Sequence, residues 1–165
     1  MLNSQQSQAS LVHKSALLSP CRTWRYSLSR EWDSERPRVL FVGLNPSTAD
    51  ETQDDPTIRR CQGFARDWGY GGLVMANLFA FRATDPAVMK QAADPVGPDN
   101  DEHLLQLAST CPLVVAAWGT HGQHLGRDHQ VRELTPNLHC LRLTKEGYPG
   151  HPLYLPKSLT PVRWS

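Results

Sequence analysis

Short apolar runs alternate along the chain with segments in which apolar residues recur at helical spacing. Three runs are apolar at almost every position, as in strands covered on both faces of a sheet: Val39–Val42, Leu73–Phe81 and LVVAAWG at 113–119. A fourth strand is predicted in LHCLRL at 138–143. Trp24, Tyr26 and Leu28 alternate with polar neighbours, which predicts a half-buried edge strand or hairpin within 21–33.

The segments between these strands favour helices. Asp55 and Pro56 supply an N-cap and a first-turn proline, and Gly69 follows Trp68 where the first helix is expected to stop. The predicted helices cover about 56–68, 101–110 and 119–134, with a shorter helical piece within 83–100.

Alternation of apolar strands with helices predicts an α/β fold in three layers, α/β/α, around a central, mainly parallel, four-stranded sheet with an N-terminal edge strand or hairpin. Residues 1–12 are polar and unpatterned and are predicted to be a flexible N-terminus, whereas 13–165 form a single domain. In such folds ligands bind at the loops that follow the strands.

Composition narrows the chemistry. The formal net charge is only +1, which disfavours strong nonspecific binding to long duplex DNA, although arginine predominates over lysine and suits phosphate contacts. The four cysteines are widely separated, so their spacing predicts buried, reduced thiols and neither a zinc ribbon nor an iron–sulfur cluster. No apolar run approaches membrane-spanning length and the first residues lack the apolar core of a signal peptide, so we expect a cytoplasmic protein without membrane contact.

Distinctive polar residues occur at three of the predicted strand exits. Gly43 begins the loop GLNPS, in which Asn45 offers a donor and an acceptor. Asn77 interrupts the second apolar run, where a buried amide needs partners, and His151 lies between Gly150 and Pro152. Because these exits fall at one end of the predicted sheet, we expect a shared pocket there.

The motifs carry a resemblance to known proteins. GLNPS, MANLFAFRATDP, VVAAWG and GHPLYLP, in that order over about 38–157, resemble motifs of the uracil-DNA glycosylase superfamily. Longer strings, GLNPSTAD, DPTIRRC, WGYGGL, NLFAFRATDP, PVGPDND and HPLYLP, resemble a bacterial and phage family known as the domain of unknown function sixteen forty-three. The final motif departs from many glycosylases, because Leu153 follows Pro152 where they have a serine.

The glycosylase resemblance implies a glycosylase-like fold and roles for individual residues. Asn45 would orient a water toward the anomeric carbon, Asn77 would pair with an extruded base, and His151 would donate to a base carbonyl and stabilise the leaving group. The remaining residues implied for substrate binding are the loop Gly43, Leu44, Pro46 and Ser47, the stacking candidates Phe64, Phe79 and Trp118, and the wedge candidates Leu153 and Tyr154.

The implied activity is hydrolysis of a base–sugar bond in DNA or a nucleotide, without metal or cofactor. Its partner would be a nucleobase, a nucleotide or a nucleic acid that is single-stranded or carries a flipped base. The same pocket is compatible with a non-catalytic nucleobase-binding module, and Ser47 and Thr48 with a nest for a nucleotide's phosphate. Metal-dependent hydrolysis is a further alternative, with candidate ligands His121, His124, Asp128 and His129.

Overall fold

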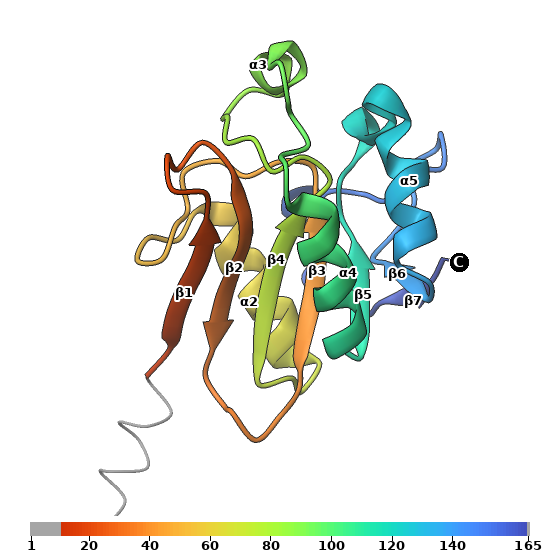
Figure 1. Cartoon of the computed structure of the whole chain (residues 1–165). Helices are drawn as coiled ribbons and strands as arrows, with labels where there is room; N and C mark the ends of the chain where they lie inside the picture. Colours follow the sequence, from red (N-terminus) through yellow and green to blue (C-terminus); the bar gives the residue numbers. More distant parts are fainter. Residues whose placement is uncertain (1–10, 165) are drawn as a thin grey trace, which may run out of the picture.

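The computed structural model describes residues 11–164, and most of the predicted flexible terminus, 1–10, lies outside them. Seven strands form one sheet in the order β1-β2-β4-β3-β5-β6-β7 (Figure 1). The strands are β1 (His13–Leu18), β2 (Arg25–Glu31), β3 (Arg38–Gly43), β4 (Gly72–Asn77), β5 (Leu113–Ala116), β6 (Leu138–Cys140) and β7 (Val162–Arg163). The helices are α2 (Pro56–Asp67), α3 (Pro86–Gln91), α4 (Asn100–Thr110), α5 (Arg127–Leu134) and the short 3-10 helices η1 (Thr120–Gly126) and η2 (Pro152–Tyr154).

The α/β class is confirmed, but the predicted four-stranded, glycosylase-like sheet is not, because the sheet has seven strands. Strands β4, β3, β5 and β6 pair in parallel, whereas β1 pairs with β2, β2 with β4 and β6 with β7 in antiparallel fashion. The sequence predicted a strand or hairpin near β2 but missed β1 and β7. Both are mostly exposed edge strands, so the apolar pattern that reveals a buried strand is weak in them.

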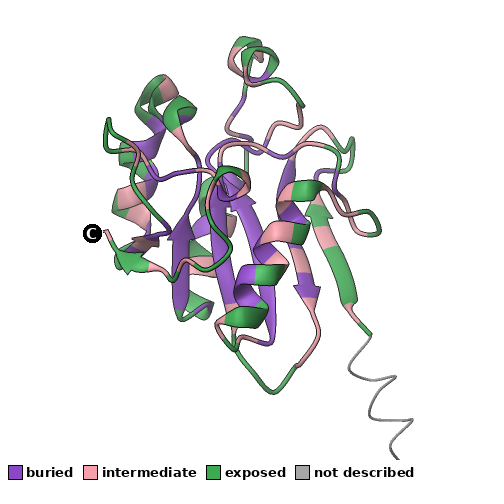
Figure 2. Ribbon diagram, turned by 180° about the vertical axis from the view of Figure 1, so that it is seen from behind, coloured by how far each residue is buried: buried purple, intermediate pink, exposed green. Residues whose placement is uncertain are grey.

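Two hydrophobic cores lie on opposite faces of the sheet. Along β3, Val39 and Phe41 face α2, while Leu40 and Val42 face the side covered by α4 and α5. This alternation explains why the strand is apolar at every position, since both faces are covered. Figure 2 shows the central strands buried along their length. Within the described residues, no helix has the length and apolar character needed to cross a membrane.

Predicted strands end earlier than their apolar patterns suggested, and one predicted helix is divided. Strand β4 stops at Asn77, and the following residues wrap around the β3 loop, with the amides of Leu78 and Phe79 donating to the carbonyls of Gly43 and Leu44. Leu78, Phe79 and Ala80 are buried, and Phe81 forms an isolated antiparallel bridge with Trp24, so the apolar run continues beyond the end of the strand. Strand β6 ends at Cys140, and the helix predicted over 119–134 is divided into η1 and α5 by the left-handed backbone of 125–126.

Candidate active site

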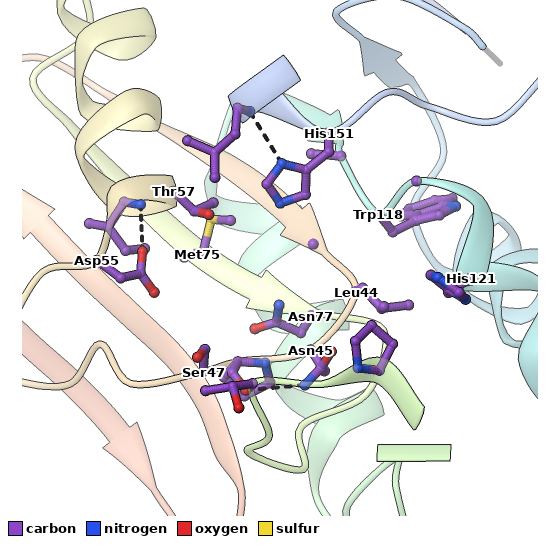
Figure 3. Close-up of a pocket in the computed structure, with 18 of the residues that line it drawn as sticks. Leu44, Asn45, Ser47, Asp55, Thr57, Met75, Asn77, Trp118, His121 and His151 are labelled. Carbon is purple, nitrogen blue, oxygen red and sulfur yellow. Dashed lines mark hydrogen bonds between the residues drawn. The ribbon is translucent and has the colours of Figure 1, made fainter. Parts of the chain in front are cut away.

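A cavity of about 650 Å³ lies beyond the carboxyl ends of β3, β4 and β5 (Figure 3). Its wall is assembled from distant segments: the β3 loop, the first turn of α2, the end of β4, the residues after β5, and the approach to η2. Asn45, Asn77 and His151 all line this cavity, together with Gly43, Leu44, Pro46, Ser47 and Trp118. The spatial prediction that these exits share one pocket therefore agrees with the geometry.

Asn77 is held on several sides at the end of β4. The residue is 3% exposed, and its Oδ1 accepts a hydrogen bond from Arg25 Nη2 at 3.3 Å. Its main-chain carbonyl accepts from Asn100 Nδ2 at 3.0 Å. Gly43 pairs opposite Asn77 in the parallel ladder, and a Cβ at Gly43 would lie 3.0 Å from Asn77 Nδ2. A side chain at position 43 would therefore crowd the amide by a few tenths of an ångström.

Asn45 ties the β3 loop to the segment after β4. Its Nδ2 donates to the carbonyl of Ala83 at 2.8 Å, with longer contacts to the carbonyls of Pro46 at 3.2 Å and Phe81 at 3.4 Å. Since carbonyl oxygens only accept, these contacts fix the orientation of the amide. The remaining polar atom, Oδ1, is an acceptor at the cavity wall, which is the character needed to orient a water molecule.

His151 is the N-cap of η2. Its Nδ1 accepts a hydrogen bond from the amide of Leu153 at 3.2 Å, so the neutral ring carries its proton on Nε2. Burial lowers the pKa of His151, against the opposing attraction of Asp55, which favours the charged ring. At neutral pH the cavity therefore holds an uncharged imidazole with one N–H donor.

The lowered pKa of His151 predicts a pH-dependent stability. Because the unfolded chain protonates this ring at a higher pH, near the ordinary value of about 6.5, the free energy of unfolding falls as the pH drops below that value. A His151→Asn variant keeps an acceptor at the N-cap but has no titrating ring. Urea denaturation at several pH values should show a shallower acid loss for this variant, and parallel losses in both proteins would contradict the prediction.

Asp55 and Arg25 also line the cavity, and sequence reasoning missed both in this role. Asp55 was recognised as the N-cap of α2, and its Oδ1 does accept from the amide of Ile58 at 2.9 Å. The same carboxylate faces the cavity, so one residue serves both purposes (Figure 3). Arg25 occurs in an alternating strand pattern that gave no sign of a buried cation.

The comparisons with known proteins give one match. A family model described as "Protein of unknown function (DUF1643)" matches residues 25–153. The chain belongs to this family. No curated protein and no solved structure matches it. The DUF1643 span begins at Arg25 and ends at Leu153, so it contains Asn45, Asp55, Asn77 and His151.

Two of the proposed stacking residues are not part of this cavity in the DUF1643 chain. Phe64 lies on the buried face of α2, where its ring centroid is 5.4 Å from that of Trp68, and Phe79 lies in the opposite core beside His124. Both side chains belong to the hydrophobic cores on the two faces of the sheet. Trp118 does line the cavity, and Tyr154 lies at its edge with 85% of its surface exposed.

The histidine-rich stretch does not form the metal site considered as an alternative. His121 lines the cavity but its Nδ1 contacts Lys90 Nζ at 2.9 Å, while His124 packs against Phe79. The non-helical backbone at His124 and Leu125 also separates His121 from Asp128 and His129 of α5. Across residues 11–164, no three His, Cys, Asp or Glu side chains are grouped to hold a metal ion.

Proposed function

We propose that this DUF1643 protein binds a nucleobase in the cavity and hydrolyses its N-glycosidic bond with a positioned water. The observation that carries this proposal is the convergence of Asn45, Asn77 and His151, which are far apart in sequence, on one cavity. The motif resemblance to uracil-DNA glycosylases supports the same assignment. A volume of about 650 Å³ lies within the ordinary range for small-molecule sites.

In the proposed reaction the bond between the base nitrogen and the anomeric carbon breaks, and its electron pair stays with the base. The water held by Asn45 Oδ1 supplies its oxygen to the anomeric carbon. The Asp55 carboxylate stabilises the positive charge that develops on the sugar and accepts a proton from the attacking water. His151 Nε2 donates a hydrogen bond to a carbonyl oxygen of the departing base, which stabilises the negative charge there.

The surroundings of the cavity favour a substrate that carries phosphate. A neighbouring cleft of about 360 Å³ shares Pro56 and Leu153 with the cavity, and its charged lining residues are the cations Arg59, Arg60 and Lys157 and one carboxylate, Asp67. These cations suit the phosphate of a nucleotide or of a short single strand, whereas the near-neutral chain lacks the charge for strong binding to long duplex DNA. The proposed partners are therefore nucleotides or single-stranded nucleic acid.

The purified protein can be tested against nucleotides and oligonucleotides that contain uracil, hypoxanthine, xanthine or alkylated bases. We expect release of a free base from at least one substrate, detected by chromatography and, in oligonucleotides, by strand scission at abasic sites. A thermal shift with these ligands but no base release would favour the non-catalytic binding module instead. If the protein shows no binding and no base release with any member of the panel, both proposals are contradicted.

A further inference from the structure

Arg25 is a buried cation that donates hydrogen bonds to a main-chain carbonyl and to the Asn77 amide oxygen. It lies at the start of β2, is 2% exposed, and lines the cavity. Its Nη1 donates to the carbonyl of Ala49 at 3.0 Å and its Nη2 to Asn77 Oδ1 at 3.3 Å. Within the described chain no carboxylate lies at ion-pair distance from it. Burial lowers the pKa of Arg25 to about 10, so the group remains charged at neutral pH.

The contact with Arg25 determines which way the Asn77 amide faces. A guanidinium has only donors, so the atom of Asn77 turned toward it must be the oxygen. The nitrogen, Nδ2, is then directed away from β2. It lies 3.0 Å from the position that a Cβ on Gly43 would occupy. In Figure 3 this nitrogen points into the space between Asn77 and His151.

His151 also presents an N–H donor to the cavity. Its Nδ1 is occupied by the amide of Leu153, which leaves Nε2–H as the group available to a ligand. The cavity thus offers N–H donors from both Asn77 and His151. A ring with carbonyl oxygens satisfies these donors, while a ring with an amino group at the same place leaves donors facing donors and unpaired.

We propose that Arg25 is a positioning residue that fixes the Asn77 amide and thereby makes the cavity select rings bearing carbonyl oxygens over rings bearing amino groups. This inference rests on the proposed binding of a nucleobase and not on hydrolysis. It adds a specificity-determining residue from the antiparallel part of the sheet, outside the strand exits that carry the other site residues.

The test compares pairs of free bases that differ in a carbonyl or an amino group, uracil with cytosine and hypoxanthine with adenine, by equilibrium dialysis. Wild type is expected to bind the carbonyl member at least about tenfold more tightly, the equivalent of one well-matched hydrogen bond. Arg25→Met has similar length but no donor, which frees the amide to rotate, so its preference should fall below about threefold. Arg25→Lys retains a donor and should restore part of the preference.

A second variant tests whether the group at position 77 is the one that reads the ring. In Asn77→Asp the carboxylate pairs with Arg25 and presents only acceptors to the cavity, so the preference should reverse toward cytosine and adenine. Arg22→Met is the matched control, because Arg22 is an exposed arginine of the preceding turn that pairs with Glu51. It should retain the wild-type preference, and circular dichroism and thermal unfolding establish that each variant is folded.

The outcomes separate this inference from the hydrolase proposal. Retention of a tenfold preference in Arg25→Met, or the absence of reversal in Asn77→Asp, would overturn the positioning role while leaving hydrolysis intact. Selective binding by the wild type without base release would support the positioning role and count against hydrolysis. If wild type binds none of the four bases, the positioning role fails, whereas base release from the nucleotides and oligonucleotides still decides hydrolysis.

Discussion

Replacing Asp55 with asparagine is expected to lower the rate of base release by about 100- to 1,000-fold while leaving substrate affinity nearly unchanged. The carboxylate lines the cavity with Asn45, Asn77 and His151 and provides the negative charge proposed to face the developing cation. An amide has the same shape but neither the charge nor the basicity. The effect therefore falls on the transition state rather than on the bound ground state.

The Asp55→Asn substitution is also expected to change the stability of the fold little. The contact of Asp55 Oδ1 with the amide of Ile58 caps α2, and asparagine is about as good an N-cap as aspartate. Asp85 provides the matched control, because it caps α3 through the amide of Ala87 without lining the cavity. Single-turnover kinetics should show loss in Asp55→Asn and wild-type rates in Asp85→Asn. Wild-type turnover in Asp55→Asn would remove the carboxylate from the proposed reaction.

The sequence predicted the interior of the fold better than its edges. Strands such as β3 are apolar on both faces because two helical layers cover them, and this pattern is visible without coordinates. The edge strands β1 and β7 are largely exposed, so their pairing depends on a neighbouring strand rather than on their own side chains. The break within 119–134 depends on a left-handed Leu125, a conformation that the residue type does not reveal.

The candidate site was predictable where polar residues interrupt an otherwise apolar or glycine-proline pattern. Asn45, Asn77 and His151 stand out in that way, and they do meet at one cavity. Phe64 and Phe79, named as stacking candidates, are buried in the cores, because an aromatic residue beside a motif has the same appearance whether it lines a pocket or fills a core. Arg25 was missed because its burial arises from tertiary packing between β2, β4 and the segment around Ala49.

The segment that carries Asp55 to the cavity depends on a second buried arginine, Arg30. This side chain has no exposed surface and its Nε donates to Asp54 Oδ1 at 2.7 Å. Its Nη2 donates to the carbonyls of Asp50 at 2.6 Å and Gln53 at 3.1 Å. Burial alone would raise the pKa of Asp54, but the hydrogen bond and charge of Arg30 hold it below its usual value. Arg30 thus anchors the loop that immediately precedes α2.

Arg30→Met is expected to lower the free energy of unfolding by about 3 to 5 kcal/mol, because it leaves the Asp54 carboxylate and two loop carbonyls without their buried partner. Lys14→Met is the matched control, since Lys14 contacts the same carboxylate at 3.5 Å from a position that is 36% exposed. Solvent screening limits its expected loss to less than about 1 kcal/mol. Urea denaturation measures both changes. Losses of equal size would mean that the buried network of Arg30 stabilises the loop no more than a surface ion pair does.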